Sequence, residues 1–187
     1  MWPPHVAQCP HLTALSLTMP WSLQGDGFRS FFLSAHMQRL VTLRLDRLYC
    51  AGPGNIRWEA IPPDDFAEVF AAMTRLEEIQ LSRVYDVDVL LPHLARAPAL
   101  RLCVIQPETQ PGARSLLLNS TMPAVSAMRS LLAAAPALQL RLMLHSPSAI
   151  PRPVLSAPEL LGPLRFLIAA LKESYPQRFE VEPDLSR

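Results

Sequence analysis

The most constraining feature of this sequence is a short aliphatic phrase that recurs along the chain. In each copy a leucine is followed by two residues, an aliphatic residue, one further residue and a second aliphatic residue. Five copies begin at Leu12, Leu40, Leu76, Leu100 and Leu138. Alternation of aliphatic and other residues predicts a short β-strand with one buried face, and its repetition predicts stacked units of one kind.

The fifth copy departs from the phrase, because Arg141 stands where an aliphatic residue is expected. A shifted register restores the alternation by placing one set of leucines on a single face of the strand: Leu138, Leu140, Leu142 and Leu144. A last short strand is predicted at Phe179-Glu-Val181, and it would close the series.

The segments between the phrases have helical spacing, with apolar residues three and four positions apart that form one stripe. The residues that carry this spacing are Phe66, Val69, Phe70 and Met73; Val87, Leu90, Leu91 and Leu94; Val125, Met128 and Leu132; and Leu160, Leu164, Leu167 and Leu171. Each of these segments is therefore predicted to be a helix that packs against a core.

Several residues are candidates for helix boundaries. Asp65 with Glu68 is close to a capping box, as is Ser156 with Glu159, and Ser120 or Thr121 is a candidate cap for the helix that is entered through Pro123. Pro92 and Pro163 interrupt two of the helical patterns, and proline disrupts a helix interior. We expect the helix to begin after the proline in both cases.

Strands that alternate with helices predict an α/β fold with a parallel sheet. One alternative is a doubly wound nucleotide-binding fold, which has near-continuous Val and Ile strands and a glycine-rich turn after the first strand. The strands predicted here are rich in leucine and no such turn follows the first one. The pattern therefore favours a stack of similar units.

The phrases at Leu12, Leu40 and Leu76, with the degenerate copies at Leu100 and Leu138, resemble the leucine-rich repeat family. The similarity is to the irregular, ribonuclease-inhibitor-like form, as found in F-box-type proteins. The resemblance implies one α/β solenoid domain of about five irregular repeats over residues 1–187, with a parallel sheet on the concave face and helices on the convex face.

The sequence also departs from that family. Regular repeats recur every 20–29 residues or so, whereas the phrase leucines here are 28, 36, 24 and 38 residues apart. Pro20, Leu48 and Val84 occupy positions where the family has Asn or Cys. No F-box helical segment is recognisable, so the chain is either a short protein of its own or a fragment of a longer solenoid.

Composition and charge exclude several functional classes. The formal net charge is +1 and the densest basic group, Arg39, Arg44 and Arg47, is interrupted by Asp46, so we expect no nucleic-acid partner. The sequence has three cysteines, no signal-peptide pattern and no uncharged apolar stretch of about 18 residues. We therefore expect no membrane association and a location in the cytoplasm or nucleus.

The sequence contains no convincing catalytic or metal-binding motif. Cys9 and His11 form an isolated pair, whereas zinc sites use about four ligands. Cys103 lies inside an apolar strand, where a thiol is inert, and the loop from Gly52 to Gly54 lacks the Lys of a phosphate-binding loop. We expect no enzyme activity, no cofactor and no metal.

A protein-binding surface is expected where the phrase residues point away from the aliphatic core. The predicted contact residues are Thr42, Arg44, Asp46, Glu78, Gln80, Ser82, Leu102 and Val104, flanked by Ala14, Ser16, Thr18 and Gln106. This face would run from small polar through charged to apolar, a mixture that suits protein partners. The apolar end would either contact a partner or be covered by the C-terminal segment or by further chain.

The function expected from these features is a protein–protein interaction module, in the form of a substrate-recognition part of an F-box-like ubiquitin-ligase adaptor. That role comes from the resemblance. Two alternatives stay open: a truncated structural fragment without activity of its own, and an α/β enzyme.

Overall fold

The computed structural model describes Cys9 and residues 11–18, 26–48, 61–84, 87–106, 121–143 and 158–182. Strands and helices alternate along this part of the chain. The strands are β1 (Ala14–Thr18), β2 (Thr42–Asp46), β3 (Glu78–Ser82), β4 (Leu102–Gln106), β5 (Gln139–Met143) and β6 (Phe179–Glu182). The helices are α1 (Asp26–Phe32), the short 3-10 helix η3 (Met37–Arg39), α2 (Pro63–Ala72), α3 (Val87–Leu94), α5 (Thr121–Ala134) and α6 (Pro158–Ser174).

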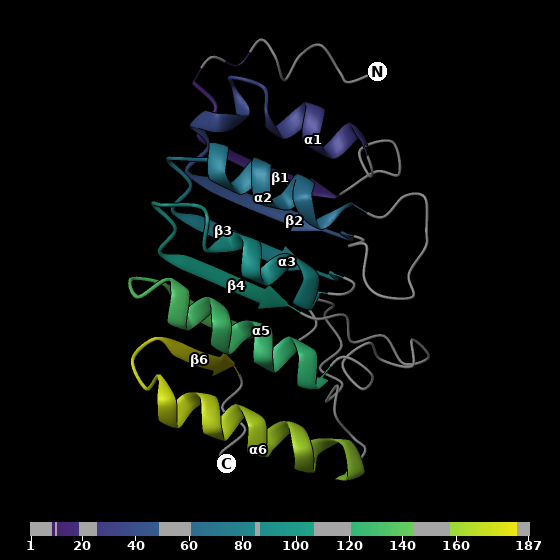
Figure 1. Ribbon diagram of the computed structural model, residues 1–187, viewed down its shortest axis with the longest axis vertical. Coiled ribbons are helices and arrows are strands. Elements are labelled where there is room, and N and C mark those ends of the chain that lie inside the picture. Colours follow the sequence, from purple (N-terminus) through teal and green to yellow (C-terminus); the bar gives the residue numbers. More distant parts are fainter. Residues whose placement is uncertain are drawn as a thin grey trace.

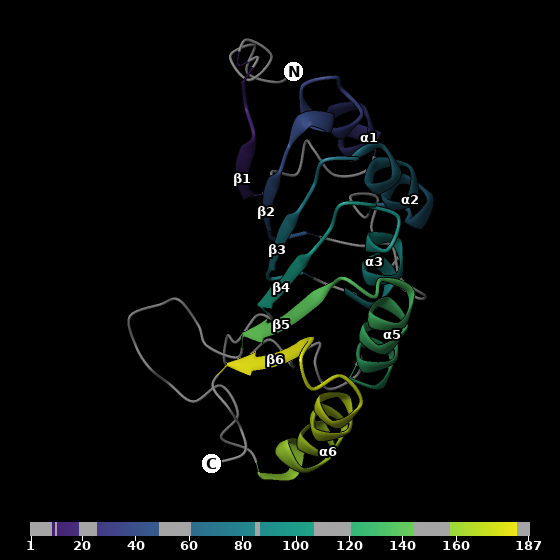
Figure 2. The ribbon, with the colours of Figure 1, turned by 90° about the vertical axis from the view of Figure 1, so that its left-hand side faces the viewer.

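The strands form one six-stranded sheet in the order β1-β2-β3-β4-β5-β6. Every neighbouring pair is parallel. Figure 1 shows the helices stacked in chain order, and Figure 2 shows them along one side of the sheet, while the other side faces away from them. The expected α/β architecture with a parallel sheet is confirmed. Its consecutive strand order differs from that of a doubly wound fold, in which the order reverses within the sheet.

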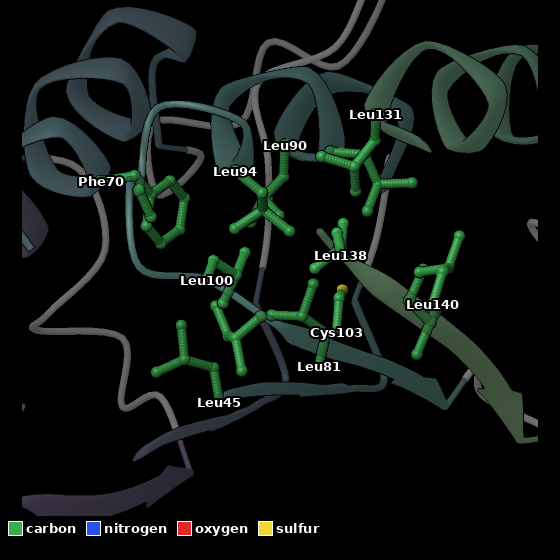
Figure 3. Packing of buried hydrophobic residues seen from close by; sticks show 14 of the residues in the cluster. Leu45, Phe70, Leu81, Leu90, Leu94, Leu100, Cys103, Leu131, Leu138 and Leu140 are labelled. Atoms are coloured by element: carbon green, nitrogen blue, oxygen red, sulfur yellow. The ribbon is translucent and has the colours of Figure 1, made fainter. Parts of the chain in front are cut away.

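The core lies between the sheet and the helices. The inward residues of each interior strand are almost fully buried, as Leu43 and Leu45 of β2 are at 0% and 1% exposure. Each phrase leucine from Leu40 to Leu138 also enters this core. Figure 3 shows two of them, Leu100 and Leu138, among the packed side chains. Burial of one such side chain contributes about 1.5–3 kcal/mol relative to an exposed position, so these units stabilise one another by shared contacts.

The first strand is packed less completely than the others. Leu15 and Leu17 of β1 occupy the same register positions as Leu43 and Leu45, yet they are only partly buried. β1 is an edge strand of the described sheet, but so is β6, whose inward Phe179 and Val181 are buried.

The predicted helical stripes agree with the packing. In α2, Phe66, Val69 and Phe70 are buried, and Phe66 meets Phe28 of α1 edge to face with ring centroids 5.2 Å apart. Leu90, Leu91 and Leu94 of α3 are buried as well. In α5 the predicted stripe of Val125, Met128 and Leu132 is also buried.

The expected start of the second helix is wrong. α2 begins at Pro63, its N-cap is Pro62 and no side chain caps it, so Asp65 lies within the first turn. Proline suits the first helical position because its missing N–H would be unpaired there in any case. Glu68 does not cap α2 but accepts a hydrogen bond from Nε of Arg29 at 2.5 Å.

The expected late starts after two prolines are also wrong, because Pro92 lies inside α3 and Pro163 inside α6. Pro92 is exposed, while its neighbour Leu91 and the nearby Leu94 are buried. Burial of the leucines on the opposite side of α3 compensates for the hydrogen bond that the proline removes.

The shifted register of the fifth strand is confirmed, since Leu138, Leu140 and Leu142 are all buried. β6 occupies the place predicted for the last strand. Ser120, Leu144, Ser156 and the loop at residues 52–55 lie outside the described residues, as do the side chains of Leu160 and Leu164.

Candidate partner-binding face of the sheet

The candidate site is the face of the sheet that points away from the helices. In β2 the inward residues Leu43 and Leu45 alternate with Thr42, Arg44 and Asp46, which are exposed or partly exposed. A strand has a side-chain period of two, so the leucine phrase that fixes the core also fixes which residues reach this outer face.

The strand register arranges the outer residues in three rows that cross the sheet. The first row contains Ala14, Thr42, Glu78, Leu102 and Gln139; the second contains Ser16, Arg44, Gln80, Val104, Arg141 and Glu180; the third contains Thr18, Asp46, Ser82 and Gln106. The structure thus brings all of the predicted contact residues together on one surface. Neighbouring strands are about 4.8 Å apart, so the rows form a continuous face.

The third row is joined by hydrogen bonds between side chains. The hydroxyl of Thr18 donates to Oδ2 of Asp46 at 3.3 Å, and Nε of Arg83 donates to Oδ1 of the same carboxylate at 2.6 Å. Ser82 Oγ donates to Oε1 of Gln106 at 3.1 Å. These contacts connect the polar side chains at this edge of the face to one another.

The backbone at this edge extends the sheet by one residue. Arg47 and Arg83 each follow a strand and have positive φ angles of 61° and 51°. The Arg47 N–H donates to the carbonyl of Ser82 at 3.0 Å, and the Arg83 N–H donates to that of Gln106 at 2.9 Å. The N–H groups of both residues thus satisfy the last carbonyl of the next strand.

The far end of the face carries an ionic cluster that the predicted site residues did not include. Arg141 of β5 lies 2.9 Å from a carboxylate oxygen of Glu180 and 3.6 Å from one of Glu182, both on β6. The signal for it was present in the sequence, because Arg141 alternates with Leu140 and Leu142 and Glu180 lies between Phe179 and Val181.

The expected apolar end of the face is corrected by the structure. Val104 is only 7% exposed and Gln106 only 8%, whereas Leu102 is partly exposed. β4 is an interior strand, and Gln80 and Arg141 flank Val104 in the second row. The face therefore passes from a polar β1 and β2, over a narrow apolar position at Leu102, to the charged β5 and β6.

The thiol beneath this face has no accessible chemistry. Cys103 is completely buried on the core side of β4, and burial raises its pKa to about 12. A thiolate is the reactive form of cysteine, and it is strongly disfavoured here. Within the described ranges, no group of three or more His, Cys, Asp or Glu residues is placed to hold a metal ion. None of the helices in the described part is both long and apolar enough to cross a membrane.

No family model matches this sequence, and neither a curated protein nor a solved structure matches it.

Proposed function

We propose that the chain is a leucine-rich-repeat solenoid that binds another protein through the outer face of its sheet. The observation that carries the proposal is the placement of Thr42, Arg44, Glu78 and Gln80 side by side on a face that the helices leave open. In a solenoid each unit contacts its neighbours in chain order, and the repeated strands present an extended surface for binding. The consecutive strand order supports this reading.

The composition of the face supports a protein partner. It combines an exposed arginine, neutral hydrogen-bonding side chains and a partly exposed leucine in adjoining rows. Arginine is enriched among the residues that dominate binding energy, and mixed polar and apolar surfaces are typical of interfaces between separately folded proteins. The near-neutral formal charge of +1 gives no support to a nucleic-acid partner.

We further propose, from the resemblance to F-box-type proteins, that the bound protein is a substrate of a ubiquitin ligase in the cytoplasm or nucleus. In this role the face would select the protein to be modified and would carry out no chemistry itself. The residues of the face agree with that division, since they offer charged, hydrogen-bonding and apolar side chains for recognition.

Site-specific photo-crosslinking tests the binding proposal. A benzoyl-phenylalanine at Gln80 lies at the centre of the face, while the same group at Ser130 lies on exposed α5 and serves as the matched control. We expect a specific crosslinked protein from Gln80 and none from Ser130, and we expect Arg44→Glu combined with Glu78→Arg to abolish it. Equal crosslinking at both positions, or insensitivity to the double substitution, would exclude the face as the binding surface.

A second measurement tests the adaptor role. The half-life of the crosslinked protein is compared in cells that express the wild-type chain and in cells that express the double variant. If the bound protein is a ubiquitin-ligase substrate, its half-life changes only with the wild-type chain, because only that chain occupies it. An unchanged half-life with confirmed binding would leave a binding module without the adaptor role.

A further inference from the structure

The charged side chains of the sheet face differ in whether they already have a charged or hydrogen-bonding partner. Asp46 is held by Arg83 and Thr18, and Arg141 is shared by Glu180 and Glu182. Arg44, in contrast, is exposed and has no hydrogen bond or ion pair within the part of the chain that the structure describes. One cation of the face is therefore available to a group from outside.

The surroundings of Arg44 suit an anionic group. In the second row its neighbours are Ser16 on β1 and Gln80 on β3, and both are neutral hydrogen-bonding side chains. Thr42 adds a further hydroxyl from the same strand. Two carboxylates of the face lie near Arg44. Asp46 is already bound by Arg83, and Glu78, the diagonal neighbour on β3, forms no ion pair with Arg44 within the described residues. A guanidinium offers a planar fork that binds a carboxylate through two parallel hydrogen bonds.

The rest of the face determines how a partner bound at Arg44 would be oriented. Leu102 is the partly exposed apolar residue of β4, two strands from Arg44, at a distance of about 10 Å across the sheet. Beyond it, Glu180 and Glu182 on β6 are exposed and share one arginine. Negative charge in a partner is therefore favoured over β2 and disfavoured over β6.

Building on the proposed protein-binding function, we propose that the partner is a protein segment that places an Asp or Glu carboxylate on Arg44 and an apolar side chain on Leu102. The segment crosses the strands, with its acidic end over β2 and no acidic residue over β6. Charge complementarity at Arg44 selects the partner. The apolar contact at Leu102 removes apolar surface from water and so strengthens binding.

The test is a selection of binders from a displayed random-peptide library on the immobilised full-length chain, followed by Kd measurement with the synthesised peptides. We expect the enriched peptides to combine an acidic residue with an apolar residue. We expect Arg44→Ala to weaken their binding about tenfold or more, and Arg44→Glu to weaken it further. A peptide whose acidic residue is replaced by lysine should regain affinity for Arg44→Glu.

Two matched controls separate the specific contact from general electrostatics. Arg47→Glu makes the same charge change three residues further along the chain. Arg129→Glu makes it at an exposed position of α5. Both variants should bind the peptides as the wild type does, and circular dichroism verifies that every variant is folded. Equal losses of peptide affinity for Arg44→Glu and Arg47→Glu, or enriched peptides without acidic residues, would overturn the proposal that Arg44 binds a carboxylate.

A substitution at the centre of the face distinguishes failure of the acidic-partner proposal from failure of the protein-binding proposal. Gln80→Trp places a bulky group between Arg44 and Leu102, so it should block any segment that crosses the face. Peptides that are blocked by Gln80→Trp but indifferent to Arg44 would leave the face as a binding surface and exclude the acidic partner. Peptides whose binding is unchanged by both substitutions would exclude the proposed function as well.

Discussion

The guanidinium of Arg83 holds the carboxylate of Asp46 across the gap between two consecutive strands. Nε of Arg83 donates to Oδ1 at 2.6 Å, and Nη2 donates to Oδ2 of the same carboxylate. The two side chains are 33% and 21% exposed, so water screens the pair only in part. Because Thr18 also donates to Asp46, one carboxylate connects β1, β2 and the residue that follows β3.

This pair is expected to contribute measurably to stability. We predict that Asp46→Asn lowers the free energy of unfolding by about 1 kcal/mol, a value near the upper end for partly exposed pairs because the contact is bidentate. A double-mutant cycle with Arg83→Met, measured by urea denaturation, should give a coupling energy of about 0.5–1 kcal/mol that shrinks in high salt. A coupling energy of zero within error would mean that the pair contributes nothing.

Arg47 is expected to strain the backbone without compensation from its side chain. Its φ is 61°, and its exposed side chain makes no hydrogen bond or ion pair within the described ranges. A residue with a Cβ pays about 1–2 kcal/mol in the left-handed region, whereas glycine adds about 0.4–1 kcal/mol of unfolded-state entropy. Arg47→Gly should therefore raise the free energy of unfolding, by up to about 1 kcal/mol.

Arg47→Ala is the matched control for that gain. Alanine removes the same side chain but keeps the Cβ, so its stability should stay near that of the wild type. The measurement is thermal or urea denaturation of the three proteins side by side. If the glycine and alanine variants were equally stable, the backbone at this position would carry no strain.

The outer face could be predicted from the sequence because strand alternation is a local property. Leu43 and Leu45 identify the buried side of β2, and Arg44 must then point the other way. The same argument could have extended the face to Arg141 and Glu180, which alternate with buried residues of β5 and β6.

The contacts within the face could not be predicted in the same way. The pairing of Asp46 with Arg83 joins residues 37 positions apart and depends on the relative register of two strands and on a left-handed residue after the second. Likewise, the prediction that a helix begins after Pro92 was wrong, because the packing of α3 on its neighbours overrides the local preference of proline. Such features depend on tertiary structure, which periodicity does not specify.

Arg178 ties the end of one helix to the start of the last strand. Its Nη1 donates to the carbonyls of Leu132, Ala135 and Pro136 at 2.9, 3.1 and 3.1 Å, and its guanidinium lies 4.9 Å from the ring centroid of Tyr175. The last carbonyls of a helix lack partners within the helix, so a cation there satisfies them and also interacts favourably with the helix dipole.

We predict that Arg178→Ala lowers the free energy of unfolding by about 1–2 kcal/mol. Arg178→Lys should recover only part of the loss, because an ammonium group lacks the planar guanidinium that lies over the ring of Tyr175. Arg129→Ala, an exposed arginine on the outside of α5, is the control and should change stability by less than about 0.5 kcal/mol. Full recovery with lysine would show that charge alone is responsible.

Cys103 is expected to make stability depend on alkaline pH. Its folded-state pKa of about 12 lies above the ordinary value of 9.0, so the buried thiol stays protonated when the unfolded chain would already lose its proton. The stability that this thiol contributes is fully present below pH 9 and is lost as the pH rises from 9 towards 12.

Comparison with Cys103→Ala isolates this effect, because the cavity that alanine leaves costs the same at every pH. Between pH 9 and 10.5 or so, the wild type should lose up to about 1.4 kcal/mol of unfolding free energy per pH unit more than the variant. In a Cys9→Ser, Cys50→Ser background, a disulfide reagent at neutral pH should label Cys103 only as fast as the protein unfolds, since the folded thiol is buried and protonated. Rapid labelling of the native protein, or parallel pH curves for the two proteins, would show that the thiol can ionise within the folded core.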